Sequence, residues 1–148
     1  MAAEGVKFKF VFCGLNTDSP EFQNLITAHN LQDYAYCIGT VDHIPSLYQA
    51  LDLYFFPSLT EGQPNALIEA MLSDLPVITS DIPPIREALP KESEHCLINP
   101  NGDASEAASK IQDLINHPQK REKYKFGSWA AEKFDVEKNY QAFFEEIK

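Results

Sequence analysis

The sequence predicts an α/β domain with a mostly parallel sheet that is flanked by helices. Short apolar segments alternate with amphipathic segments along all 148 residues of the chain. The apolar segments lack an inside–outside alternation, which is typical of strands that are buried on both faces. The amphipathic segments begin with capping residues or proline, as helices do. Together these patterns favour one open sheet with right-handed crossover connections.

Five apolar segments are predicted to be strands. The first is rich in phenylalanine and valine and is followed by Gly14, and the second is followed by Gly39. The third ends at Pro57 and Ser58, and the fourth is rich in valine and isoleucine. The predicted strands are residues 7–13, 34–38, 53–56, 76–79 and 96–98.

The first helix has the clearest start signal. Ser19-Pro20-Glu21 places a capping residue, a proline and an acid in the order that opens a helix. The residues expected on its inward face are Phe22, Leu25, Ile26 and His29. Further helices are predicted over residues 44–51, 64–73, 85–89 and 103–116, and residues 118–148 are expected to form one or two more. Their anchors are expected to be Trp129, Phe134, Tyr140 and Phe144.

The composition excludes several classes of function. The formal net charge is −10, which argues against nucleic acid or an anionic membrane surface as the main partner. No apolar run is long enough to cross a bilayer. Cys13, Cys37 and Cys96 include no CxxC pair, so buried free thiols in a reducing compartment are expected. The four histidines do not have the spacing of metal ligands, and we expect no bound metal.

Residues 1–5 are interpreted as a leader and residues 6–148 as the domain.

The segment from Pro57 to Ala70 carries the most chemical information. Ligands of open parallel sheets bind at the carboxyl ends of the strands, so the loops at Gly14, at Gly39 and over residues 58–65 are candidates. The helix predicted to start at Pro64 offers free backbone N–H groups, which suit a diphosphate. Gly62 leaves room for a ligand because it has no Cβ.

Glu61 and Glu69 flank this helix start and would repel a bare diphosphate. Each carboxylate can instead accept hydrogen bonds from vicinal hydroxyls of a ribose or hexose. A helix start with two acids therefore fits a nucleotide-sugar. A structural interpretation stays open, because Asn65, Glu69 and Ser73 share one helical face that water could solvate. Glu61 could equally be an ordinary acid beside the helix dipole.

A longer stretch of sequence resembles a known family. Residues 39–87 read GTVDHIPSLYQALDLYFFPSLTEGQPNALIEAMLSDLPVITSDIPPIRE. This order of strand, acid–glycine turn, Glu-Ala-Met helix and Pro-Val strand resembles the E-x7-E region of retaining GT-B glycosyltransferases of family 4, the glycosyl transferases group 1. Agreement is strong over residues 38–87 and weaker over residues 8–101. The resemblance implies the Rossmann-like, C-terminal half of a GT-B fold, which binds the nucleotide-sugar.

The resemblance also implies roles for individual residues. Glu61 would be the catalytic residue and hold hydroxyls of the transferred sugar, and Glu69 would bind the ribose. Thr40 and Val41 would contact the base, and Gly14 would border the nucleotide. The residues implied beside the sugar and diphosphate are Gly62, Gln63, Pro64, Asn65 and Ala66.

The implied activity is sugar transfer from a nucleotide-sugar with retention at the anomeric carbon, without metal or other cofactor. The sequence has no D-x-D motif. The acceptor, a glycan or a lipid-linked sugar in polysaccharide biosynthesis, would bind an N-terminal domain that is absent here. The arginine and lysine with which the family neutralises the diphosphate have no match, so the isolated chain is expected to be inactive. Tyr140 and Phe144 are then expected to be exposed, since the family's last helix returns to the first domain.

Two alternatives remain open at this point. The chain could be a non-catalytic nucleotide-sugar-binding module or accessory subunit of the same fold. A nucleotide-sugar epimerase of that fold is a third possibility, which the E-x7-E region disfavours.

The expected location is the cytoplasm, and the missing domain could also bring the protein into contact with the inner membrane. The sequence identifies neither the sugar nor the base.

Overall fold

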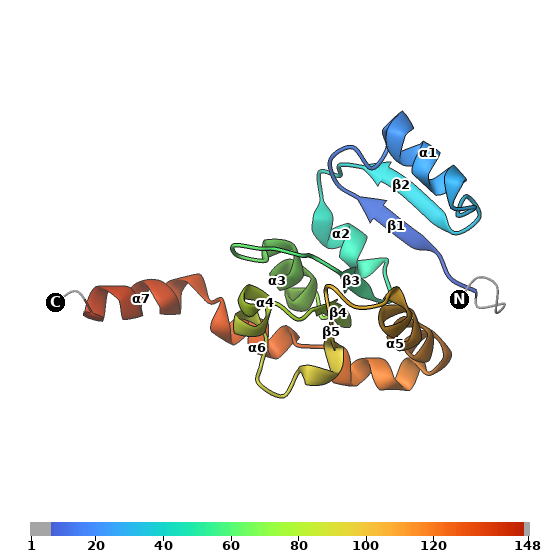
Figure 1. The fold of residues 1–148 in the computed structure, drawn as a ribbon. Helices are drawn as coiled ribbons and strands as arrows, with labels where there is room; N and C mark the ends of the chain where they lie inside the picture. The colour runs from blue at the N-terminus through green and yellow to red at the C-terminus, as the bar shows by residue number, and fades with distance from the viewer. Residues whose placement is uncertain (1–6, 147–148) are drawn as a thin grey trace. The chain divides into compact units, whose positions relative to one another are not determined.

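The structure of the chain is a computed structural model that describes residues 7–146 (Figure 1). The chain divides into two compact units, one that reaches to Ser46 and one that begins at Leu47. Strands and helices alternate through both units, and every strand pair is parallel. The predicted parallel α/β class is therefore confirmed. The predicted leader, residues 1–5, lies outside the described residues.

The first unit contains one strand–helix–strand repeat. Its strands pair in parallel with Phe10 opposite Ala35 and Phe12 opposite Cys37. The Ser19 hydroxyl accepts a hydrogen bond from the N–H of Phe22 at 3.2 Å, which confirms the predicted helix start. The elements are β1 (Phe10–Cys13), α1 (Pro20–Ala28) and β2 (Ala35–Gly39), followed by α2 (Ile44–Gln49), which ends in the second unit.

The predicted inward face of α1 is only half correct. Ile26 is buried and the Phe22 ring packs edge-on against Phe12, with 5.2 Å between centroids. Leu25, however, is 56% exposed, and His29 lies beyond the last helical residue. A nine-residue helix over two strands has little apolar surface to cover, and Phe22 and Ile26 occupy it.

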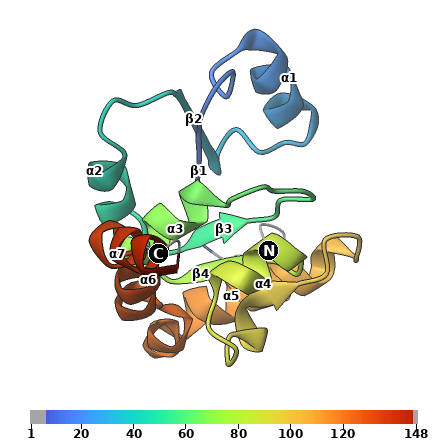
Figure 2. The ribbon, with the colours of Figure 1, turned by 90° about the vertical axis from the view of Figure 1, so that its left-hand side faces the viewer.

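The second unit is built around the strand β4 of a three-stranded sheet, and its last helix, α7, extends away from that sheet (Figures 1 and 2). In it, β4 lies between β3 and β5, and all four residues of β4 are buried, as its apolar sequence predicts. Helices α3 and α5 both pack against β4. Its elements are β3 (Tyr54–Phe56), α3 (Asn65–Leu72), β4 (Val77–Ser80), α4 (Pro83–Ala88), the 3₁₀ turn η2 (Glu94–Cys96), β5 (Leu97–Ile98), α5 (Ala104–Asn116), the 3₁₀ turn η3 (Pro118–Tyr124), α6 (Gly127–Lys133) and α7 (Val136–Glu146).

The hydrogen-bonded strands form two sheets where the sequence predicts one. Among the described residues, β1 pairs with β2, and β3 pairs with β4. The strand β3 has three residues, Tyr54 to Phe56, and their partners are Val77 to Thr79. A strand of three residues forms few hydrogen bonds with its neighbours. The apolar pattern of the sequence identifies the strand but does not show how many such bonds it makes.

Helix α3 is held from two sides. Leu67, Ala70 and Met71 are fully buried toward the core. The first residue of α6, Gly127, lies against the end of α3, where a Cβ would come within 2.9 Å of Asp74 Oδ1 and 3.1 Å of the Met71 carbonyl oxygen. The absence of a side chain at Gly127 therefore allows α6 to begin against α3.

The C-terminal segment forms a 3₁₀ turn and two helices, where one or two helices are predicted. The Trp129 indole N–H donates to the Ala88 carbonyl at 3.0 Å and joins α6 to α4. On α7, Tyr140 is 61% and Phe144 41% exposed, which confirms the exposure expected of them. Phe143 is exposed as well.

The three cysteines are free thiols, as predicted, but they differ in burial. Cys96 is buried, whereas Cys13 and Cys37 are only half-buried because they lie in the small two-stranded sheet. The expectation of full burial is therefore wrong for those two. Within residues 7–146 no helix is both long and apolar enough to cross a membrane.

Candidate functional site

The turn after β3 leads into α3 without a side-chain cap. Pro64 precedes the helix and makes no capping hydrogen bond through its side chain. The N–H of Asn65 donates to the Gln63 carbonyl at 2.9 Å, so that donor is occupied. The first turn is thus less open to an anion than the sequence predicts.

One backbone donor of α3 remains available. The N–H of Ile68 donates to the Pro64 carbonyl at 3.0 Å. Among the hydrogen bonds of the described residues, none uses the N–H of Ala66 or Leu67. Leu67 is fully buried while Ala66 is half-buried, so of these two residues only Ala66 has surface that an external oxygen can reach.

Gly62 lies in open space ahead of α3. A Cβ built on Gly62 meets no heavy atom within 4 Å, and the backbone is outside the left-handed region. Neither packing nor backbone conformation within the described residues therefore requires glycine here. The space in front of Gly62 is open, and its role beside a ligand stays a prediction.

The two acids of the E-x7-E motif act electrostatically on the same phenol. Burial is the main cause of a strongly raised pKa at Tyr54, followed by its neighbour Tyr48 and then by the charges of Glu69 and Glu61. Both carboxylates thus favour the protonated form of Tyr54. Glu61 is half-buried in the turn, and Glu69 is exposed on α3.

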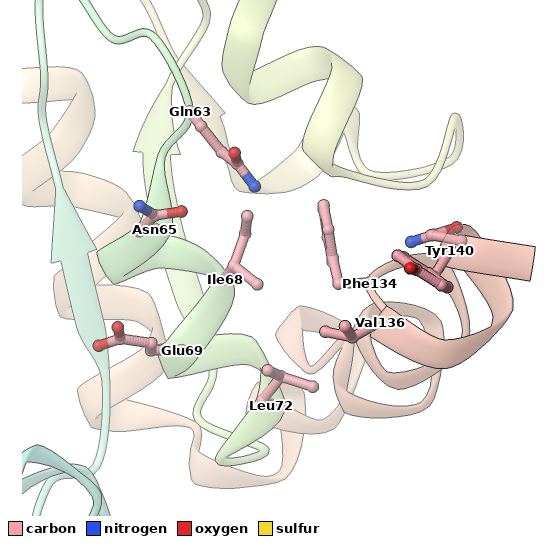
Figure 3. Close-up of a pocket in the computed structure, with 9 residues that line it drawn as sticks. Gln63, Asn65, Ile68, Glu69, Leu72, Phe134, Val136 and Tyr140 are labelled. Carbon is pink, nitrogen blue, oxygen red and sulfur yellow. The ribbon is translucent and has the colours of Figure 1, made fainter. Parts of the chain in front are cut away.

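A shallow depression of ≈ 530 Å³ lies between α3 and the C-terminal segment (Figure 3). Ile68 and Leu72 point toward Phe134 and Val136, while the carboxylate of Glu69 points away from them. Glu61 does not line this depression. The depression thus has a mainly apolar wall where α3 faces the C-terminal segment, and the carboxylate of Glu69 is directed away from that wall. Its lining residues are Gln63, Asn65, Ile68, Glu69, Leu72, Phe134, Val136, Asn139 and Tyr140.

The other predicted residues lie in the first unit, at the carboxyl ends of β1 and β2. Gly14 donates its N–H to the Gly39 carbonyl at 2.7 Å, and both glycines have positive φ angles, 136° and 68°. The Thr17 hydroxyl donates to the Gly14 carbonyl and accepts from the Gly39 N–H, each at 3.0 Å. Exposed Thr40 and half-buried Val41 follow directly. Turn geometry alone thus explains Gly14, and its binding role stays a prediction.

Sequence reasoning did not single out Thr17, Tyr48 or Tyr54. A threonine shortly after Gly14 is a weak signal of a side chain that could bridge two strand ends. The two tyrosines look like ordinary apolar positions in the sequence. Within residues 7–146, no three His, Cys, Asp or Glu side chains form a group that could hold a metal ion. The prediction of catalysis without metal is not tested by this structure.

Comparison with protein families identifies the fold family. The sequence model for "Glycosyl transferases group 1" matches residues 2–127. The chain belongs to this family. The match covers the turn and helix that carry Glu61 and Glu69, together with the residues at the ends of β1 and β2.

Two curated proteins and one solved structure illustrate the similarity. An uncharacterized glycosyltransferase of Haemophilus influenzae is 26% identical over 106 residues, covering 72% of this chain and 30% of its own length. The putative glycosyltransferase EpsF of Bacillus subtilis is 35% identical over 77 residues, covering 52% and 20%. HepE of Anabaena, solved in complex with UDP and glucose, superposes with a TM-score of 0.80 at 25% identity, covering 94% of this chain and 40% of HepE. The chain thus spans less than half the length of each.

The superposition with HepE supports the GT-B assignment of the fold. Nearly the whole chain aligns, although it corresponds to a minor part of HepE. The parallel α/β architecture matches the C-terminal, Rossmann-like half of a GT-B fold, as the sequence predicts.

Proposed function

We propose that this domain binds a nucleotide-diphosphate sugar and contributes to transfer of the sugar, with retention, to a glycan or glycolipid acceptor. The observation that carries this proposal is the position of Glu61 and Glu69 on either side of a helix start that has an open glycine position and an unused backbone N–H, with both charges acting on the half-buried phenol of Tyr54. Membership of the glycosyl transferases group 1 and the UDP and glucose complex of HepE support the same ligand class.

The two acids have different roles in this proposal. Glu69 accepts hydrogen bonds from the ribose hydroxyls, and Glu61 from hydroxyls of the transferred sugar near the reacting carbon. The Ala66 N–H donates to a diphosphate oxygen, and Gly62 leaves room for the sugar ring. Carboxylates suit these positions because each accepts two hydrogen bonds from a vicinal diol. No metal or other cofactor is required.

The charge of the segment explains why transfer needs a further domain. Residues 38–85 contain no lysine or arginine, and the chain carries a net charge of −10. A diphosphate leaving group needs cationic partners to stabilise its developing charge. We propose that these bases and the acceptor site lie in a separate domain. This chain alone then binds the donor weakly and does not turn it over.

The proposed division of roles is tested by replacing each acid in the complete protein. A charge-assisted hydrogen bond is worth about 1.5–3 kcal/mol, or roughly tenfold to a hundredfold in affinity. Glu69→Ala should weaken binding of the free nucleoside diphosphate by that factor. Glu61→Ala should leave that affinity nearly unchanged and lower the transfer rate.

The matched control is Glu87→Ala, which removes an exposed acid from α4 and should change neither quantity. Calorimetric titration gives the affinities, and product formation gives the rates. Equal losses of diphosphate affinity in Glu61→Ala and Glu69→Ala would contradict the division of roles. Nucleotide-sugar binding that depends on Glu69, without transfer to any acceptor by the complete protein, would favour the non-catalytic module.

A further inference from the structure

Tyr48 connects α2 to the first turn of α3. Its side chain is buried, with 6% exposure. Its hydroxyl donates a hydrogen bond to the carbonyl of Ala66 at 3.1 Å. Ala66 is the second residue of α3, and the same residue carries the unused backbone N–H. A buried phenol therefore contacts the part of α3 that lacks a side-chain cap.

Tyr54 extends this contact toward the two acids. Its ring packs edge-on against Tyr48, with 5.6 Å between centroids and an interplanar angle of 88°, and stacks on Phe56 at 5.8 Å. The two phenols are also joined by a hydrogen bond that raises the pKa of Tyr54. The one hydroxyl proton of Tyr48 is donated to the Ala66 carbonyl, so between the two phenols Tyr54 is the donor and Tyr48 the acceptor.

The hydrogen bonds thus run in one direction, from Tyr54 to Tyr48 and from Tyr48 to the Ala66 carbonyl. Glu69 lies three residues after Ala66, close to one helical turn, and so shares its side of α3. Glu61 and Glu69 both favour the protonated form of Tyr54. The relay therefore begins at a phenol on which both acids act and ends at the helix start.

We propose that Tyr48 and Tyr54 are positioning residues, a two-phenol relay that fixes the first turn of α3 and orients the Ala66 N–H and Glu69 toward the donor. The functional part of this inference rests on the proposed function. A helix of eight residues without a side-chain cap tends to fray at its start. The hydrogen bond from Tyr48 restrains the start of α3 from outside the helix, where a capping side chain is absent.

The hydroxyl groups distinguish a relay from ordinary packing. Phenylalanine would fill the same space and keep the ring contacts, and it would avoid burying two hydroxyls. If the rings alone mattered, loss of the hydroxyls would be close to neutral. The relay instead predicts that each hydroxyl contributes, and that removing both costs little more than removing one, since either loss breaks the same chain.

The experiment compares Tyr48→Phe, Tyr54→Phe and the double variant with the parent chain. Tyr124→Phe is the matched control, because Tyr124 is a half-buried tyrosine of the same unit whose ring packs on His95 at 4.7 Å. Amide hydrogen exchange is followed by NMR in α3 and in α5, and UDP and UDP-glucose are the binding probes. One neutral hydrogen bond corresponds to about a fivefold change.

Both single variants should exchange about fivefold faster at the hydrogen-bonded amides from Ile68 to Ala70, with α5 unchanged, and bind the probes about fivefold more weakly. The double variant should resemble the single variants, and Tyr124→Phe the parent. Unchanged α3 exchange in Tyr48→Phe, or equal acceleration in α3 and α5, would overturn the relay. Faster exchange in α3 supports the relay whether or not the parent chain binds UDP or UDP-glucose. If the parent chain binds neither probe, that result counts against the proposed function and not against the relay.

Discussion

Two glycines allow fold and function to be tested separately. An alanine at Gly127 would place its Cβ 2.9 Å from Asp74 Oδ1 and 3.1 Å from the Met71 carbonyl. The Asp74 side chain can move, but the carbonyl belongs to a fully buried residue of α3 and cannot move easily. An alanine at Gly62 would meet no atom within 4 Å.

The magnitudes follow from these contacts. Forcing a methyl group into a packed contact costs about 1–3 kcal/mol, and the loss of glycine's freedom in the unfolded chain offsets about 0.4–1 kcal/mol. Gly127→Ala should therefore lower the free energy of unfolding by about 1–2 kcal/mol, and Tm by about 2–8 °C for a domain of this size. Gly62→Ala has only the favourable contribution, and its Tm should stay equal or rise by about 1–4 °C.

Urea unfolding followed by the fluorescence of Trp129, the one tryptophan, measures both effects. Trp129 lies two residues after Gly127 in α6 and reports directly on that contact. Calorimetry with the nucleotide-sugar supplies the second readout, where Gly62→Ala should bind more weakly because its methyl group occupies ligand space. A stable Gly127→Ala, or a destabilised Gly62→Ala, would refute this reasoning about close approach and open space.

Three further predictions concern buried polar groups. Thr79→Val should lower the free energy of unfolding by about 1 kcal/mol, since the Thr79 hydroxyl donates to the Phe56 carbonyl at 3.0 Å. Ser80→Ala should leave urea unfolding unchanged or shift it upward, since the buried Ser80 hydroxyl has no partner among the described residues. Burial raises the pKa of Cys96 to about 12, so iodoacetamide at pH 8 should label Cys96 only after denaturation. Mass spectrometry measures the labelling, and label on Cys96 in the native chain would contradict its burial.

Raising the pKa of Cys96 also gives stability a pH dependence. The folded state holds the thiol proton above the ordinary value of 9.0, where the unfolded chain has begun to lose it. The free energy of unfolding should then fall as the pH rises from about 9 toward 12. Cys96→Ala should reduce that slope, although Tyr54 contributes in the same direction.

Local signals in the sequence account for much of the fold. Ser19 and Pro20 identify the start of α1 because capping is a property of adjacent residues. The apolar run of β4 identifies a central strand because its residues must be buried on both faces. The prediction that Leu25 is buried is wrong, because its burial depends on how much of the sheet α1 covers. Helical periodicity carries no information about that area.

The candidate site could be predicted as a segment but not as a geometry. The spacing of Glu61 and Glu69 follows from the sequence, whereas the action of both charges on Tyr54 does not. The rings of Tyr48 and Tyr54 meet across the short connection between α2 and β3, and the Tyr48 hydroxyl bonds to α3 at a residue eighteen positions further along the sequence. The use of the Asn65 N–H by Gln63 is likewise a property of the turn.

In the proposed function, the segment from Glu61 to Glu69 contacts a nucleotide-sugar. NMR titration of the ¹⁵N-labelled chain with UDP-glucose and GDP-mannose, each beside its free diphosphate, tests it most directly, because weak binding is still visible residue by residue. We expect saturable shifts at the amides of Gly62, Ala66 and Glu69 with at least one nucleotide-sugar, and their loss in Glu69→Ala. Shifts confined to α5 and the C-terminal helices, or none with any of the four ligands while the chain is folded, would contradict the claim.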